Sequence, residues 1–96
     1  MNKSPVRIDY SKAFDKPLRK SPLKIKIAFR KRLKLFLQNP FHPLLNNHSL
    51  SGKLSGYRSI NVTGDWRVIY STRSHSREGT SVIFEMIGTH SQLYKG

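Results

Sequence analysis

One stretch, from Gly56 to Tyr70, restricts the possible folds of this chain more than any other part of it. Its apolar residues recur at every second position, which is typical of strands that bury one face of a sheet. Thr63, Gly64 and Asp65 separate two such runs, and Gly64 can adopt a positive φ there because it has no Cβ atom. The stretch therefore predicts a β-hairpin in the middle of a small sheet. Its alternating apolar residues are Ile60, Val62, Trp66, Val68 and Tyr70.

Two short elements are predicted near the N-terminus. Val6–Tyr10 alternates apolar and polar residues, and we expect it to be a strand that pairs with the C-terminal sheet, since a lone strand is unstable. Ser11–Lys20 is predicted to be a short helix or an irregular helical turn. Pro17 limits it, because an interior proline removes a hydrogen bond and collides with the preceding turn.

The longest predicted helix runs from Pro22 to Gln38. Ser21 is its expected N-cap and Pro22 its first residue, and Asn39 ends it because the residue before a proline avoids the α region. One apolar stripe with helical spacing is expected to face the core; it consists of Ile25, Phe29, Leu33, Phe36 and Leu37. The remaining positions are rich in lysine and arginine without acidic neighbours, so we expect this face to meet an anionic partner, either RNA or an acidic protein.

The rest of the chain supplies a loop region and a third strand. A helical turn is predicted at Pro43–Asn46, followed by a loop that contains His48 and leads into the hairpin. Ser71–Gly79 is polar and is predicted to connect the hairpin to a strand at Thr80–Ile87. The nearly continuous apolar run of that strand indicates burial on both faces. A last helical turn is expected at Ser91–Tyr94.

Length and charge limit the number of domains that the chain can form and the kinds of partner that it can bind. The 96 residues are expected to form one domain, residues 1–96, around a modest core. The chain has no cysteine, which fits a reducing compartment, and it has neither an apolar run of about 18 residues that would span a membrane nor the apolar segment of a secretory signal. A formal charge of +13 favours a polyanion as partner. Nucleic acid is the first class to consider, with an acidic protein or an anionic membrane surface as alternatives.

Three residues outside the apolar faces form the candidate site for chemistry. Asp65 lies at the hairpin tip and His90 directly after the third strand, so the two can meet at one edge of the sheet, and the loop with His48 leads into the same hairpin. Acid and base groups next to cations suit RNA cleavage, in which a base takes the 2′-hydroxyl proton and an acid protonates the leaving 5′-oxygen. The alternative is structural, because an aspartate in a turn often bonds its own backbone and a surface histidine often has no special role.

Further residues are predicted to contact RNA around this site. Lys53, Arg58 and Arg67 can stabilise the extra negative charge on phosphorus. Trp66 or Tyr94 can stack on a base, although a tryptophan in this pattern more often belongs to the core. The four histidines match no metal-binding spacing, so we expect neither a metal nor another cofactor.

The order of these residues resembles that of the RelE/ParE superfamily of toxins from toxin–antitoxin systems, and within it the YafQ-like mRNA interferases. The resemblance covers most of the chain from Asn39 onward, and its most specific part is the ending Gly-Thr-His-x-x-Leu followed by an aromatic residue. The pieces that carry it are His48–Gly52, Gly56–Arg58, Asp65–Tyr70 and Gly88–Tyr94. The resemblance implies an α+β, RelE-like fold in which an N-terminal strand and two helices pack on a small antiparallel sheet, with a short C-terminal helical turn.

The resemblance also implies a function. Toxins of this kind cleave mRNA, commonly in the ribosomal A site and without a metal ion, and acidic antitoxins wrap them and neutralise their charge. For this chain it implies acid–base work by His90 and Asp65, assistance from His48 and a substrate contact for Tyr94. We therefore expect a cytoplasmic toxin that is a monomer when free and whose partners are mRNA, the ribosome and an acidic antitoxin.

One position departs from the pattern of the family. YafQ-like enzymes usually carry a histidine where this chain has Asn61, and an asparagine can hydrogen-bond RNA but cannot exchange a proton near neutral pH. Either Asn61 positions the RNA or the activity is weakened. The alternative functions are a non-catalytic or gyrase-directed, ParE-like toxin and a basic RNA-binding module. The presence of His48, Asp65 and His90 argues against the gyrase-directed branch.

Overall fold

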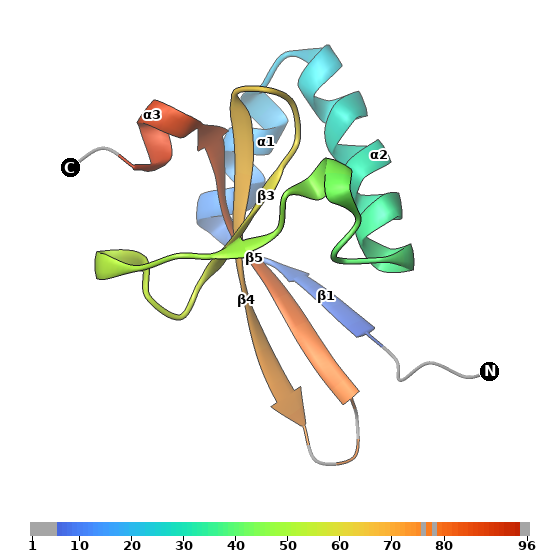
Figure 1. The fold of residues 1–96 in the computed structure, drawn as a ribbon. Helices are drawn as coiled ribbons and strands as arrows, with labels where there is room; N and C mark the ends of the chain where they lie inside the picture. Colours follow the sequence, from blue (N-terminus) through green and yellow to red (C-terminus); the bar gives the residue numbers. More distant parts are fainter. Residues whose placement is uncertain (1–5, 76, 78, 95–96) are drawn as a thin grey trace.

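A five-stranded sheet carries the two longer helices of this protein on one of its faces (Figure 1). The computed structural model describes residues 6–75, 77 and 79–94, and its strand order is β1-β5-β4-β3-β2. The strands are β1 Val6–Tyr10, β2 His48–Ser49, β3 Arg58–Asn61, β4 Trp66–His75 and β5 Gly79–Thr89. β1 runs parallel to β5 and the other pairs are antiparallel, so the expected pairing of the N-terminal strand is confirmed and the sheet is mixed.

The helical elements follow the predicted order. They are α1 Lys12–Lys20, α2 Leu23–Gln38, η1 Pro43–Leu45, η2 Gly52–Leu54 and α3 His90–Leu93. The hydroxyl of Ser11 caps α1 by accepting the backbone N–H of Phe14, and the helix continues past Pro17. α1 is therefore a complete short helix rather than an irregular turn.

The predicted cap of the long helix is wrong. Ser21 does not begin α2; its hydroxyl donates to the carbonyl oxygens of Pro17 and Leu18, at 3.1 and 2.7 Å, and so ends α1. Pro22 then occupies the N-cap position of α2 and supplies no side-chain cap. α2 begins only at Leu23, so Ser21 lies one position before the N-cap, and its side chain turns back to the end of α1 instead.

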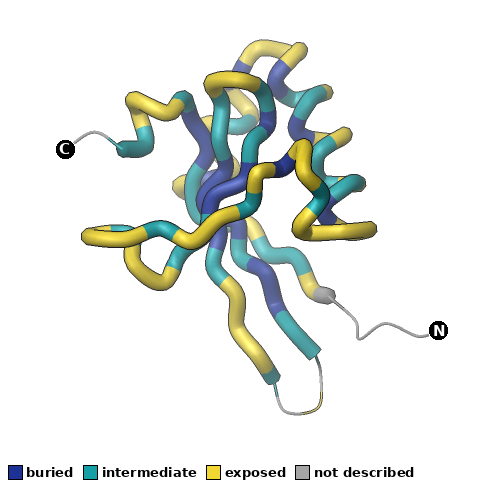
Figure 2. The backbone as a smooth tube through the Cα atoms, in the orientation of Figure 1, coloured by how far each residue is buried: buried dark blue, intermediate teal, exposed yellow. Residues whose placement is uncertain are grey.

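The polar connection expected at Ser71–Gly79 is largely strand. β4 continues to His75 and pairs there with Gly79, so β4 and β5 form a long arm that extends beyond the helices (Figure 1). Most of the outer part of β4 is exposed (Figure 2), and its backbone hydrogen bonds are supplied by β5 instead of by water. On β5, Val82, Phe84 and Ile87 are buried while Ile83 is only half-buried, so the prediction of burial on both faces holds only in part.

The core lies between the sheet and the two longer helices. Ile25, Phe29 and Phe36 of α2 are buried as predicted, but Leu37 is 48% exposed. Successive residues of a helix point about 100° apart, so Phe36 and Leu37 cannot both face the sheet. Phe84 is at the centre, and its ring lies within about 6 Å, centroid to centroid, of five others. Those rings belong to Tyr10, Phe14, Phe29, Phe36 and Tyr70.

The turn between β3 and β4 differs from its prediction. Gly64 does not have a positive φ; among the described glycines that conformation belongs to Gly52, Gly56 and Gly79. The side chain of Thr63 organises the turn instead, because its hydroxyl oxygen accepts the backbone N–H of Trp66 at 3.1 Å and that of Asp65 at 3.4 Å. The turn therefore has a fixed shape, and Asp65 is presented at its end.

Candidate functional site

Asp65 and His90 lie next to each other at one end of the sheet. The pairing of Trp66 with Thr89 brings the β3–β4 turn beside the end of β5, and the backbone N–H of His90 donates to the carbonyl oxygen of Asp65 at 2.9 Å. Both residues are exposed. The expected meeting of these two residues is thus confirmed by the backbone, and their catalytic roles stay predictions.

The ending Gly-Thr-His-x-Gln-Leu has a structural explanation. Thr89 is the N-cap of α3: its hydroxyl accepts the backbone N–H of Gln92, and the Gln92 side chain accepts the backbone N–H of Thr89. This capping box satisfies free N–H groups at the start of a very short helix. It holds His90 at the first helical position and places the ring of Tyr94 4.6 Å from the imidazole, centroid to centroid. The capping-box spacing is visible in the sequence as Thr89-x-x-Gln92 and indicates a helix that starts at His90, one residue before the predicted start at Ser91.

Gly88 is predicted to be essential for this arrangement. A Cβ atom at Gly88 would lie 2.9 Å from the Gln92 side-chain oxygen, so Gly88→Ala should displace Gln92 and weaken the capping box by about 1 kcal/mol. If the chain cleaves RNA as predicted, this variant should lose that activity at nearly unchanged global stability, measured by primer extension and by urea unfolding. The matched control is Gly64→Ala, where a Cβ would meet nothing within 4 Å and φ is not positive. Equal activity of both variants would contradict the prediction.

His48 lies in a short strand rather than in the expected loop. β2 pairs with β3, and His48 is opposite Ser59. Its Nδ1 atom is 2.8 Å from the carbonyl oxygen of Asn46. Because a carbonyl only accepts, this contact requires Nδ1–H as donor and leaves Nε2 of the neutral ring with a free lone pair. Asn46 has a left-handed conformation, with φ 46° and ψ 48°, which asparagine tolerates better than most residues.

His48 and Asn61 share the sheet face that points away from α1 and α2, here called the outer face. Residues paired across strands point to the same side, so His48 and Ser59 belong together, and Asn61 belongs with Arg67. Ile60, between Ser59 and Asn61, is fully buried on the helix side. The Asn61 side-chain oxygen is buried and has no hydrogen-bond partner among the described residues. The outer face therefore carries an unpaired polar group where the family pattern has histidine.

Two of the predicted RNA contacts lie on the other side of the sheet. Arg58 pairs with Tyr70, which belongs to the core, so its side chain points to the helix side. There its Nε donates to the Asn47 side-chain oxygen at 2.7 Å and its guanidinium lies over the ring of Phe41. Trp66 packs against the core as a half-buried residue. Neither side chain lies on the face shared by His48 and Asn61, and the predicted RNA contacts of Arg58 and Trp66 stay predictions.

The other two predicted cations differ from each other. One terminal nitrogen of Arg67 donates to the turn carbonyl oxygens of Gly64 at 2.8 Å and Thr63 at 3.2 Å. This contact fastens the turn that presents Asp65. Lys53 is exposed in η2, just after Gly52 with its positive φ. Arg58, Trp66 and Arg67 thus each make structural contacts within the protein. The side chain of Lys53 makes no such contact among the described residues.

Charges in the described part of the chain are mostly unpaired. Its ion pairs are Arg7 with Asp9 at 3.2 Å and Arg19 with Asp15 at 3.4 Å, both largely exposed. Among these residues no cluster of three or more His, Cys, Asp or Glu side chains could hold a metal ion. No helix in the same described residues is both long and apolar enough to cross a membrane. Because so few of the basic residues form ion pairs within the described part of the chain, most of the positive charge is available to an external polyanion.

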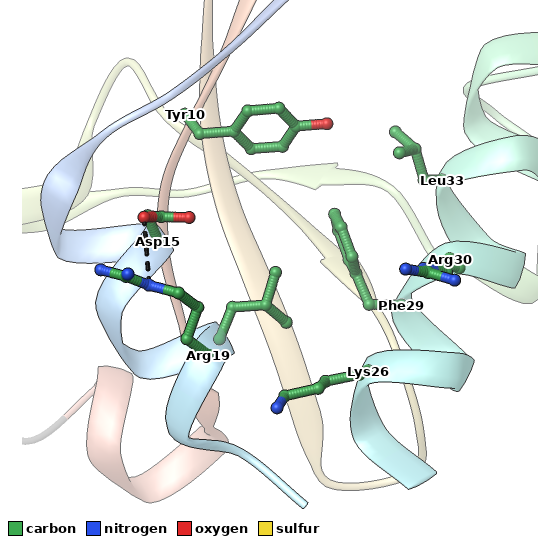
Figure 3. Close-up of a pocket in the computed structure, with 8 residues that line it drawn as sticks. Tyr10, Asp15, Arg19, Lys26, Phe29, Arg30 and Leu33 are labelled. Atoms are coloured by element: carbon green, nitrogen blue, oxygen red, sulfur yellow. Dashed lines mark ion pairs between the residues drawn. The ribbon is translucent and has the colours of Figure 1, made fainter. Parts of the chain in front are cut away.

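A hollow of about 370 Å³ separates α1 from α2 (Figure 3). Phe29 and Leu33 of α2 face Tyr10 across it, and burial raises the pKa of the Tyr10 hydroxyl above its usual value. Arg30 also lines the hollow, while Asp15 is held by Arg19. None of the residues predicted for catalysis lines it. The candidate site is thus an exposed surface at the end of the sheet and not this hollow.

The comparisons with known proteins agree with this fold. Residues 6–95 match the family described as bacterial toxin of type II toxin–antitoxin system, YafQ. This chain belongs to the YafQ toxin family. It is therefore a type II toxin, as the resemblance implied. The sequence matches no curated protein.

Solved structures of YafQ toxins have a fold similar to that of this chain. YafQ from Escherichia coli strain BL21(DE3) is 24% identical with a TM-score of 0.73, and the match covers 94% of this chain and 99% of that one. YafQ in the E. coli DinJ–YafQ complex is 26% identical with a TM-score of 0.64, at 94% and 99% coverage. A YoeB/ParE toxin from Agrobacterium tumefaciens is 15% identical with a TM-score of 0.72, at 88% and 98% coverage, and shows the fold alone. The predicted α+β, RelE-like fold is confirmed, and the gyrase-directed alternative is not favoured.

Proposed function

We propose that this YafQ-family toxin is an endoribonuclease that cleaves mRNA at the ribosomal A site without a metal ion. The observation that supports it best is the backbone contact that holds His90 against Asp65 at the end of the sheet. Two groups that can exchange protons are thereby kept together on an exposed surface of a strongly basic protein. RNA cleavage needs such a pair next to bound phosphate.

The proposed reaction is an attack of the 2′-hydroxyl on the adjacent phosphorus. A base removes the 2′-hydroxyl proton, the O2′–P bond forms, the P–O5′ bond breaks, and an acid protonates the leaving 5′-oxygen, which gives a 2′,3′-cyclic phosphate and a 5′-hydroxyl. His90 and Asp65 carry the proton transfers. His48 assists through its free Nε2 lone pair, which the Asn46 carbonyl keeps available by holding Nδ1–H.

Substrate contacts are assigned to groups around this pair. The ring of Tyr94 lies 4.6 Å from the imidazole of His90, centroid to centroid, at a tilt of 48°, and an aromatic ring beside the proposed site can stack on a base. Lys53 is free to bind phosphate, and Asn61 places an amide on the outer face beside the turn that Arg67 fastens. Arg58 and Trp66 are assigned structural roles on the helix side.

The proposed partners follow from charge and from the relatives. E. coli YafQ, which this chain resembles, was also solved in a DinJ–YafQ toxin–antitoxin complex, and a charge of +13 suits an acidic antitoxin. We propose such an antitoxin here, with mRNA and the ribosome as the other partners. The free toxin is proposed to be a monomer that acts in the cytoplasm, where translation takes place.

Primer extension on a reporter mRNA tests the proposed activity. The toxin is induced together with a translated reporter or with the same reporter lacking its start codon. We expect discrete cuts within the reading frame that require translation. Growth arrest without cuts would contradict the proposal and favour a gyrase-directed or ribosome-blocking toxin.

Asn61→His restores the residue that is usual in the family, and we expect it to raise the cleavage rate. A histidine there adds a group that exchanges protons near neutral pH, and general acid–base catalysis contributes about 10²–10⁴-fold. Because other groups already share this task, the expected gain is about tenfold. The rate is measured by primer extension at equal toxin levels. Asn61→Ala is the control and should lower the rate; a faster Ala variant would contradict a positioning role for Asn61.

A further inference from the structure

A second hollow lies on the helix side of the sheet, below the end of α2. Its volume is about 320 Å³, and it lies between Phe36 and Leu37 of α2 and Thr72, Thr80 and Val82 of the β4–β5 arm. Leu37, Phe41 and Val82 supply apolar walls, and Arg58 supplies a cation. The candidate catalytic residues do not line it. This hollow is thus chemically distinct from the proposed RNA site, with one cation set among apolar side chains.

Arg58 is held in place by neutral groups. Its Nε donates to the Asn47 side-chain oxygen at 2.7 Å, and the Asn47 amide nitrogen donates to the Tyr70 hydroxyl oxygen at 2.7 Å. The guanidinium carbon lies 5.4 Å from the centre of the Phe41 ring. Among the described residues Arg58 makes no ion pair. These contacts fix the direction of the guanidinium and leave its terminal nitrogens free for an external carboxylate, which it can bind in bidentate geometry.

The walls of the hollow indicate a partner that is apolar as well as acidic. Phe41 is 66% exposed and Leu37 is 48% exposed, and large apolar side chains that flank a hollow commonly mark a docking surface. A nucleic-acid strand would require several cations along its backbone, whereas the lining of this hollow contains Arg58 alone. A peptide that carries an apolar side chain next to a carboxylate matches both features.

We propose that this hollow binds an acidic peptide segment of a partner protein, with an apolar side chain between Leu37 and Phe41 and a neighbouring carboxylate on Arg58. The proposal rests on the proposed acidic partner for the identity of its occupant. It is independent of catalysis, because the hollow lies on the opposite side of the sheet from His48 and Asn61. A variant can therefore lose peptide binding and keep RNA cleavage, or lose RNA cleavage and keep peptide binding.

The test is a titration of the full, isotope-labelled chain, followed by NMR. The probe is the blocked peptide acetyl-Glu-Phe-Leu-Glu-amide, compared with the same peptide carrying Gln in place of Glu. We expect shifts at the backbone amides of Phe41, Arg58 and Val82, and weaker binding of the Gln peptide by about tenfold, because the charge-assisted contact is lost. A blunt-ended RNA hexamer serves as the competing class of ligand.

Two variants on the same helix make the test specific. Leu37→Glu places a negative charge on the wall of the hollow and should weaken peptide binding by about tenfold. Ile27→Glu is matched, since Ile27 is 46% exposed on α2 but does not line the hollow, and it should change binding less than about twofold. Both variants should retain the cleavage activity. The proposal would be overturned if both variants weakened peptide binding equally, or if the peptide shifted amides elsewhere on the protein. It would also be overturned if the RNA, but not the peptide, shifted the amides of these residues.

Discussion

Replacing His90 by alanine is expected to slow mRNA cleavage by about 10²–10⁴-fold and to abolish growth arrest. The change removes the imidazole but keeps the backbone contacts, because the N–H of residue 90 still donates to the carbonyl of Asp65 and its carbonyl still accepts the N–H of Tyr94. The side chain is exposed, so no cavity forms. The measurement is primer extension on a translated reporter, with circular dichroism to check the fold.

His75→Ala is the matched control for this experiment. His75 is also a histidine, but it lies at the far end of β4 and contacts the hydroxyl of Ser81 at 2.8 Å. Its loss should leave cleavage unchanged. If the His90 variant still cut mRNA at the rate of the parent chain, the assignment of the site to this end of the sheet would be wrong.

Phe84→Ala is expected to produce the largest loss of stability, about 3–5 kcal/mol in the free energy of unfolding. The Phe84 ring is fully buried and contacts rings from β1, α1, α2 and β4. Removing it leaves a cavity that these elements cannot all fill. Small domains are stable by only about 5–15 kcal/mol, so the variant should be partly unfolded at 37 °C. The measurement is urea unfolding, read as a shift of the midpoint at constant slope.

Phe41→Ala provides the comparison for Phe84→Ala, with the same change of side chain at an exposed position. Its loss should cost less than about 1 kcal/mol, mainly through the contact with Arg58. Similar losses for the two variants would contradict the placement of Phe84 at the centre of the core.

Much of the fold was predictable because local patterns and tertiary contacts agree. Alternation predicted β1 and the β3–β4 hairpin, a nearly continuous apolar run predicted the strand at Thr80–Ile87 within β5, and the apolar stripe predicted α2. The predictions were wrong where one residue lies between two helices and where a strand is made of polar residues. Ser21 ends α1 instead of beginning α2, and the polar residues of outer β4 form a strand because β5 pairs with them.

At the candidate site, the alternation of buried residues also indicates the face to which neighbouring side chains point. Ile60 was correctly predicted to be buried, and the same alternation places Arg58, two residues earlier, on the helix side. Trp66 shares a face with Val68 in the same way. The alternation of Ile60, Val62, Trp66 and Val68 was visible in the sequence and already favoured a core position for Trp66.

By itself, the sequence determined the basic charge and most of the order of elements, because composition and local spacing along the chain set these, and it supplied the residues proposed to carry chemistry. Only the tertiary structure decided which of them share a surface. His90 meets Asp65 because β4 pairs with β5 in one register, and Arg58 is directed into a hollow on the helix side by contacts with Asn47 and Phe41. Register and side-chain contacts depend on residues far apart in the chain, so local patterns do not specify them.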